Sequence, residues 1–190
     1  MEKKLVPVGL SNRHCHLSQA DIDVLFGQGY ELTKFKDLKQ PGQFACDEKI
    51  EVVGPKGSYK MRVLGPARKA SQVEVSVTDG FTLGIKPPVM GSGSLDGTPG
   101  AKLVGPKGEV EIECGVIAAA RHIHMTPAEA TDLGVEDKQL VNVRFGGERA
   151  VVFENVLCRV NKDFALEFHA DIDEGNAAGL KNGDVVEIIG

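Results

Sequence analysis

Two copies of one short motif, placed far apart, constrain the fold of this chain more than any other feature. RHCHLSQADIDVLFG begins at Arg13, and RHIHMTPAEATDLG begins at Arg121, 108 residues later. Each copy reads Arg-His-x-His and continues into a segment that ends at a glycine, Gly27 or Gly134. The repetition predicts an internally duplicated protein, with two related units in one chain of 190 residues.

Each copy also carries the signals of a short helix directly after the histidines. In the first copy, Ser18 and Asp21 form an S-x-x-D cap; in the second, Thr126 and Glu129 form a T-P-x-E cap. The closing glycine follows so soon that we expect helices of about nine residues or fewer.

Most of the remaining sequence alternates apolar and polar residues with the period of half-buried strands. The clearest runs are residues 59–63, 72–77 and 109–113, and VGPKG occurs twice, at 53–57 and 104–108, as a turn that leads into a strand. With 23 glycines and no long helical period, the chain is predicted to be mainly β, built as two related β-barrels with short α-helices.

The positions of the repeats suggest how the chain is divided. We expect residues 12–119 to form one barrel, and residues 1–11 to join residues 120–190 in the other. The stretch KPPVMGSGSLDGTPG, residues 86–100, is too irregular for a strand and too long for a hairpin turn, so it is either a functional loop or a linker.

Composition excludes several classes of protein. A net charge of −5 and a pI near 5.6 argue against nucleic acid as a partner. No segment approaches the roughly 20 apolar residues of a membrane helix, and the apolar stretch near Met1 is too short for a signal peptide. Four cysteines without a CxxC pair read as buried thiols, which suits a cytosolic protein.

The histidines carry the chemical signal. Four of the five lie in the two His-x-His pairs, His14 with His16 and His122 with His124. Residues two apart project from the same face of a strand, so each pair can ligate one metal ion, and zinc is the metal that imidazole most often binds. The fifth, His169, ends an apolar strand and completes a three-histidine site with His122 and His124.

The other pair needs a ligand that is not histidine. Glu74 is a candidate, although its alternating strand by itself favours exposure to water, and Asp171 and Asp173 compete for the role. Arg68, in a turn, is a weak candidate for a phosphate clamp. Cys15 lies between two expected ligands, so we interpret it as a structural thiol rather than a nucleophile.

Taken in order, SNRHCHLS, VGPARKASQVEVS, SGSLDGTPGAKLVGPKG, RHIHMT and EFHADIDE resemble the PduL-type phosphotransacylases, also called phosphate propanoyltransferases. The resemblance runs over nearly the whole chain. It implies an acyltransferase of propanediol degradation that converts short-chain acyl-CoA, propanoyl-CoA or acetyl-CoA, and inorganic phosphate into acyl phosphate and coenzyme A, reversibly.

The resemblance also implies a structure: a homodimer whose chains each form two six-stranded β-barrels, with two Zn²⁺ ions in a pocket that binds coenzyme A. The residues that match the family's functional positions are His14, His16 and Glu74 for the first metal, His122, His124 and His169 for the second, and Arg68 for phosphate. We expect coenzyme A to contact the loop at Gly91 and Gly93. Because LVPVGL begins close to Met1, we expect a cytosolic form without a microcompartment-targeting extension.

The predicted mechanism is direct, zinc-assisted attack of phosphate on the thioester. Its mechanistic rival is an acyl-enzyme on Cys15. A different class is a zinc-dependent thioester or amide hydrolase, which would not require phosphate. A non-catalytic β-barrel module stabilised by zinc would instead have closed sites with four ligands.

Overall fold

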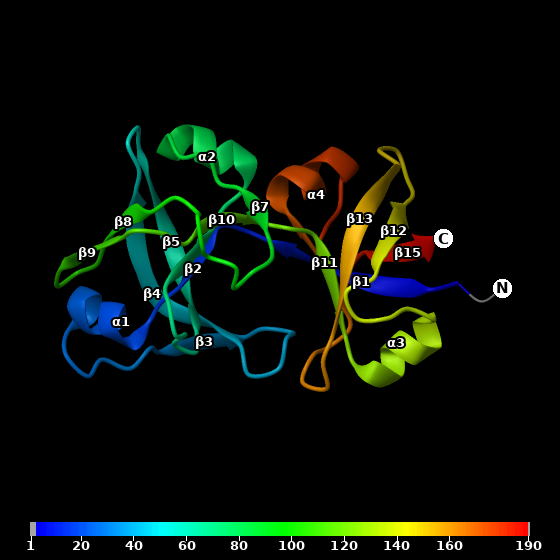
Figure 1. Cartoon of the computed structure of the whole chain (residues 1–190), viewed down its shortest axis with the longest axis horizontal. Coiled ribbons are helices and arrows are strands. Elements are labelled where there is room, and N and C mark those ends of the chain that lie inside the picture. The colour runs from blue at the N-terminus through cyan, green and yellow to red at the C-terminus, as the bar shows by residue number, and fades with distance from the viewer. Residues whose placement is uncertain (1–2, 190) are drawn as a thin grey trace. The chain divides into compact units, whose positions relative to one another are not determined.

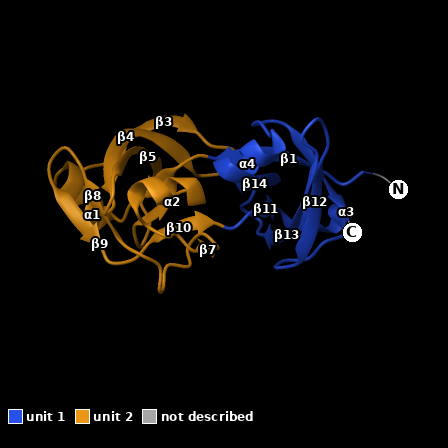
Figure 2. Ribbon diagram, turned by 90° about the horizontal axis from the view of Figure 1, so that it is seen from above, with its two compact units in different colours: residues 1–11, 120–190 blue, residues 12–119 orange. Residues whose placement is uncertain are grey.

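The computed structural model describes residues 3–189, which fall into two compact units (Figure 2). Unit 1 comprises Met1–Ser11 and Ala120–Gly190, and unit 2 comprises Asn12–Ala119. The predicted mainly β fold with short helices is confirmed (Figure 1).

Unit 1 is a closed six-stranded barrel, as the resemblance implied. Its strands are β1 (Leu5–Ser11), β11 (His122–Met125), β12 (Leu140–Phe145), β13 (Val151–Val160), β14 (Glu167–Asp171) and β15 (Val185–Ile189), in the order β1-β14-β11-β13-β12-β15. β1 closes the ring, because it pairs in parallel with β14 and antiparallel with β15. Two helices complete the unit, α3 (Pro127–Leu133) and α4 (Ile172–Ala178).

The core of unit 1 follows from the two-residue period of its strands. Ile123, Met125 and Phe168 are fully buried in the apolar core. His122 and His124 alternate with these core residues on β11, so their rings project from the opposite face of the strand. The pattern that builds the core therefore also presents the histidines together.

Unit 2 contains a nine-stranded sheet. Eight of its strands run in the order β7-β10-β6-β2-β5-β4-β8-β9, and β3 pairs with β4. They are β2 (His14–His16), β3 (Lys34–Asp37), β4 (Phe44–Val53), β5 (Ser58–Gly65), β6 (Gln72–Glu74), β7 (Val89–Met90), β8 (Ala101–Val104), β9 (Glu109–Ile112) and β10 (Val116–Ala119). Within residues 3–189 its outer strands β7 and β9 do not pair, so this sheet lacks the closed six-stranded ring of unit 1.

The repeated VGPKG segments are hairpin turns that support two helices. They join β4 to β5 and β8 to β9. The second residue of each segment is a glycine packed against the end of a helix: Gly54 against α2 (Val77–Leu83) and Gly105 against α1 (Gln19–Phe26). The backbone N–H of Lys56 donates to the Leu83 carbonyl at 3.0 Å, and that of Lys107 donates to the Leu25 carbonyl at 3.0 Å. The turns thus satisfy carbonyls that a helix end leaves unpaired.

The helices predicted after both His-x-His pairs are present, with 8 residues in α1 and 7 in α3. Ser18 and Thr126 cap them as expected, and Gly27 and Gly134 end them.

The expectation that residues 72–77 form one strand is wrong. β6 ends at Glu74, and Ser76 is the N-cap of α2, because its side chain accepts the backbone N–H of Asp79. A cap in the same position starts α4, where Asp171 accepts the backbone N–H of Glu174. Each unit therefore contains two strand-to-helix connections of the same design.

Candidate metal centres

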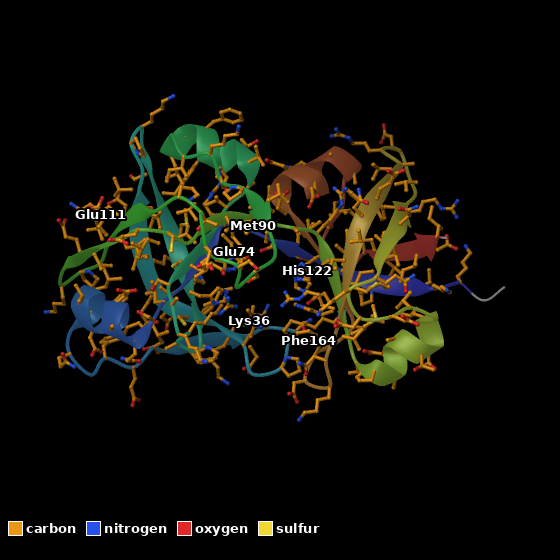
Figure 3. The ribbon with its side chains drawn as sticks, viewed as in Figure 1. Lys36, Glu74, Met90, Glu111, His122 and Phe164 are labelled. Carbon is orange, nitrogen blue, oxygen red and sulfur yellow. The ribbon has the colours of Figure 1, made fainter. Side chains whose placement is uncertain are left out.

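The structure gathers three histidines in unit 1. The potential ligand atoms of His122, His124 and His169 all lie within 4.8 Å of one another. His122 and His169 are direct partners in the antiparallel β11–β14 ladder, and the ring of Phe164 lies 4.2 Å from that of His124, centroid to centroid. His122 and Phe164 can be located in Figure 3.

Unit 2 contains an equivalent group. His14, His16 and Glu74 offer ligand atoms that likewise lie within 4.8 Å of one another. His14 is the direct partner of Glu74 across the β2–β6 ladder, and its Nε2 lies 3.6 Å from Glu74 Oε2. Glu74 therefore occupies the place that His169 has in unit 1. Only 8% of Glu74 is exposed, so the water-facing orientation that its strand pattern favoured is wrong.

The first histidine of each pair is oriented by its own backbone. Nδ1 of His14 lies 2.8 Å from the Asn12 carbonyl oxygen, and Nδ1 of His122 lies 2.8 Å from the Ala120 carbonyl oxygen. A carbonyl only accepts, so Nδ1 carries a hydrogen in this contact, and Nε2 is the ring nitrogen left to face a ligand. A backbone partner of this kind is typical of metal-binding histidine.

The second histidine of each pair is buried without a hydrogen-bond partner for one ring nitrogen. Nδ1 of His16 and Nδ1 of His124 have none among the described residues. Burial, with the charges of His14 and Arg68, lowers the pKa of His16 to about 3. Burial, with the charges of His122 and His169, lowers the pKa of His124 to about 2. Both rings are therefore neutral near pH 7, the form that binds a metal ion.

Glu74 is held in its charged form. Burial alone raises its pKa, but electrostatic interaction with His14 and His16 and a hydrogen bond from Ser92 lower it to about 2. The Ser92 hydroxyl donates to Glu74 Oε1 at 2.8 Å, and the Gln72 amide donates to both Glu74 Oε1 and Ser92. A buried carboxylate held this way is a ready cation ligand.

These groups fit a metal ion. Each brings three nitrogen or oxygen donors together, and each includes a buried histidine, His16 or His124, with one ring nitrogen that has no hydrogen-bond partner among the described residues. Imidazole and carboxylate donors suit Zn²⁺, and three protein ligands leave a position open for a substrate.

Two alternative ligands fall outside the groups. Asp171 instead caps α4, and burial raises its pKa. Asp173 belongs to the first turn of the same helix.

Glu167 was missed by the sequence analysis. It is 8% exposed, pairs with His124 across the β11–β14 ladder, and places Oε2 3.0 Å from His169 Nε2. Its counterpart in unit 2 is Gln72, which pairs with His16. The sequence spacing could have indicated both residues. Glu167 lies two residues before His169, and Gln72 lies two residues before Glu74, so each shares a face of its strand with the third ligand.

Arg68 lies beside the Glu74 group. It is half-buried, its side chain donates to the Ser92 hydroxyl at 3.4 Å, and its charge contributes to the lowered pKa values of His16 and Glu74. Ser92 therefore touches both the carboxylate and the guanidinium.

The loop that contains Gly91 and Gly93 is tied to the same place. The backbone N–H of Gly93 donates to the Gln72 side-chain oxygen at 2.8 Å, and β7, which leads into the loop at Met90, pairs with β10 as β6 does. Met90 and Glu74 are both labelled in Figure 3. The sequence analysis left residues 86–100 as either a functional loop or a linker. The segment lies wholly within unit 2 and does not connect the two units, so a loop is the interpretation that agrees with the structure.

Cys15 is fully buried and faces the core of unit 2, opposite to His14 and His16. Burial raises its pKa far above the ordinary value, with a further contribution from Cys46. A thiol in this state is a poor nucleophile.

No helix among the described residues has the length and apolar character required to cross a bilayer.

Comparison with known proteins agrees with the predicted family. A family model described as phosphate propanoyltransferase matches residues 7–181. A phosphate propanoyltransferase of Thermotoga maritima is 56% identical over 184 residues, which cover 96% of this chain and 88% of that protein. Proteins of the same name from Rhodopseudomonas palustris (55% identical, 96% of this chain, 81% of that protein) and Clostridioides difficile (49%, 99% and 90%) are similar over the same extent. The predicted resemblance is confirmed, and the chain belongs to the phosphate propanoyltransferase family of acyltransferases.

Proposed function

We propose that this enzyme transfers a short acyl group, propanoyl or acetyl, reversibly between coenzyme A and inorganic phosphate, with one Zn²⁺ held by each of its two ligand groups. Membership of the family supports phosphate as the acceptor. The single observation that carries the metal assignment is the equivalence of the two groups: each contains a His-x-His pair and a third donor directly across the ladder.

The ligands are His14, His16 and Glu74 in unit 2 and His122, His124 and His169 in unit 1. When bound, Zn²⁺ would supply Lewis-acid polarisation of the thioester carbonyl and stabilise the departing thiolate.

The role proposed for Arg68 is to hold phosphate. A guanidinium presents parallel N–H groups that match two oxygens of a phosphate, and its charge opposes the repulsion between phosphate and the thioester oxygen. Ser92, which accepts from Arg68, keeps the guanidinium oriented. The loop at Gly91 and Gly93 is the proposed contact for the phosphates of coenzyme A, and the Gly93 N–H, which donates to Gln72, fixes that loop in place.

The chemical step is a direct displacement. A phosphate oxygen forms a bond to the carbonyl carbon, the carbon–sulfur bond breaks, and the electron pair leaves with the coenzyme A thiolate, which takes a proton from solvent. No acyl-enzyme is needed, in keeping with the buried Cys15 thiol and its raised pKa.

The first experiment measures bound zinc and the release of coenzyme A thiol from propanoyl-CoA and acetyl-CoA, with and without phosphate. A control without acyl-CoA corrects for the four cysteines. We expect about two zinc ions per chain and release that needs phosphate, stops on chelation and returns with Zn²⁺. Release without phosphate would establish a hydrolase instead, and phosphate-dependent release unaffected by chelation would disprove the zinc assignment.

We further propose that the enzyme is a homodimer in solution. Val77 and Phe81 are 45% and 78% exposed and lie one turn apart on α2, where their burial by a second copy would be favourable. Light scattering coupled to size exclusion should give twice the chain mass of 20.3 kDa, and a mass of one chain would disprove the dimer.

A further inference from the structure

The arginine that opens each Arg-His-x-His motif makes the same kind of contact in both units. Arg13 donates from Nε at 3.0 Å and from a terminal nitrogen at 2.6 Å to Asp79 Oδ1. Arg121 donates to Glu174 Oε1 at 2.7 Å. Asp79 lies five residues after Glu74, and Glu174 lies five residues after His169. The duplication thus preserves an ion pair as well as the ligands.

Each carboxylate has two tasks, one for each oxygen. Asp79 uses Oδ1 for Arg13 and Oδ2 for the backbone N–H of Ser76, the N-cap of α2. Glu174 uses Oε1 for Arg121 and Oε2 for the backbone N–H of the N-cap of α4. The helix start and the arginine are therefore fastened to the same side chain.

The arginines are also held from a second side. The guanidinium of Arg13 lies 4.2 Å from the ring centroid of Tyr59, and that of Arg121 lies 5.6 Å from that of Phe153. Arg121 makes two further hydrogen bonds, at 2.9 and 2.6 Å, to the Glu154 carbonyl. Each guanidinium is thereby fixed in direction before it meets its carboxylate.

The position of these ion pairs in the ladders gives them a role. The β2–β6 ladder has three residue pairs, and its last is His14 with Glu74. The β11–β14 ladder also has three, and its last is His122 with His169. The terminal pair of a short ladder opens most easily. In both units the terminal pair consists of metal-ligand candidates. The arginine directly precedes the first residue of this pair in the sequence, and the helix follows shortly after the second.

We infer that Arg13–Asp79 and Arg121–Glu174 are positioning pairs, each of which closes the open end of one ladder and thereby fixes the distance between the His-x-His pair and the third ligand of its own group. This inference rests on the proposed function, because it takes the two groups to be zinc sites. The acids at the equivalent positions of α1 and α3 have serine and threonine donors instead: Asp21 accepts from the hydroxyls of Ser18 and Ser71, and Glu129 accepts the backbone N–H of its N-cap residue Thr126.

The test uses Asp79→Asn and Glu174→Gln. An amide has one acceptor oxygen, so it can serve the helix cap or the arginine but not both. Glu129→Gln is the matched control, because Glu129 accepts the backbone N–H of its N-cap residue Thr126 as Glu174 accepts that of Asp171. Asp21→Asn is a second control, which makes the same chemical change at the equivalent position of α1, where the carboxylate accepts from the Ser18 and Ser71 hydroxyls. Zinc affinity is measured by competition with a chromophoric chelator, separately for each group, in backgrounds where the other group has lost its His-x-His pair to alanine.

We expect Glu174→Gln to weaken zinc binding by the unit 1 group about 10- to 100-fold, the usual effect of losing a support behind a ligand, and to leave the unit 2 group unchanged. Asp79→Asn should do the reverse. Arg13→Met and Arg121→Met should weaken zinc binding by their own group in the same way. Arg13→Lys and Arg121→Lys should recover part of that affinity, since lysine restores the charge without the planar guanidinium. Both controls should bind zinc like the parent.

The Tm of each metal-free variant is compared with that of the metal-free parent. This comparison separates an effect on the position of the ligands from a loss of stability of the whole fold. The inference is overturned if folded Asp79→Asn and Glu174→Gln keep parental zinc affinity, or if each weakens both groups equally. A parent that binds no zinc at either group would instead refute the proposed function itself.

Discussion

His122 and His169 stand opposite each other at the end of the β11–β14 ladder, with ring centroids 5.0 Å apart and ring planes 5° from parallel. The equivalent pair in unit 2 is His14 with Glu74. One position thus differs between two otherwise equivalent groups: unit 1 presents three imidazoles, and unit 2 presents two imidazoles and a carboxylate. The groups therefore differ by one negative charge when bound to the same ion.

His169→Ala should remove one zinc ion and leave the other in place. Because polarisation by a metal ion is worth several kcal/mol, we expect kcat/KM to fall by about 100-fold or more. Asp173→Asn, a change at a nearby acid outside both groups, should keep both ions and near-parental activity. Metal analysis beside steady-state kinetics checks this, and an unchanged zinc content in His169→Ala would contradict it.

Arg68→Ala should raise the KM for phosphate and reduce kcat, with a loss in kcat/KM of about 100-fold, since a positioned donor to a developing charge is removed. Arg68→Lys should recover only part, because an ammonium cannot bind two phosphate oxygens as a fork. The exposed neighbour Lys69 supplies the control as Lys69→Ala. Unchanged phosphate kinetics in Arg68→Ala would show that another group holds phosphate.

Cys15→Ala should retain activity within about threefold. The thiol is buried, and its pKa is raised by burial, so the thiolate needed for an acyl-enzyme is scarce. Truncation in the core should lower the free energy of unfolding by about 1 kcal/mol. Kinetics normalised to folded protein provide the measurement; a loss of activity beyond 100-fold would favour the route through Cys15.

The metal-free protein should become less stable as the pH falls below 6.5. The pKa values of His16 and His124 lie at about 3 and about 2, below their ordinary value of 6.5. Between pH 6.5 and these lowered pKa values, the two histidines bind protons in the unfolded chain but not in the folded chain. Acid therefore favours unfolding. Glu74, whose pKa is lowered to about 2 from 4.5, adds to this loss below pH 4.5.

Thermal melts of chelated protein between pH 8 and 5 test this dependence. We expect Tm to fall by about 5 °C or more, and the fall to be smaller in His16→Asn and His124→Asn, which cannot titrate. A Tm that stays level or rises toward pH 5 would contradict the proposed neutral state of these rings.

Gly105→Ala should destabilise unit 2 without altering either metal group. An added Cβ would lie 2.4 Å from the Leu25 carbonyl oxygen, a backbone atom that cannot yield without moving α1. We expect a loss of about 2 kcal/mol in the free energy of unfolding. Gly146→Ala, where an added Cβ meets nothing within 4 Å, is the control. Equal denaturation midpoints for the two variants would count against the tight packing of the VGPKG turn.

The sequence predicted those features whose cause is local. A cap such as Ser18 with Asp21 acts over one helical turn, and the alternation in residues 59–63 reports a strand by itself, so both were predicted correctly. His-x-His likewise forms a donor pair wherever its backbone is extended. The resemblance then supplied Glu74 and Arg68, which pattern alone ranked as surface residues.

Tertiary structure decided what depends on pairing between distant strands. Only the register of β6 on β2 places Glu74 beside His14 and buries it, and only that of β14 on β11 brings Glu167 and His169 to the His122 pair. The sequence by itself therefore determined the mainly β class, the capped helices after the histidines and the identity of most metal-ligand candidates. The partners of those histidines, and the ion pairs of Arg13 and Arg121, were decided by long-range hydrogen bonding between strands, which no local pattern encodes.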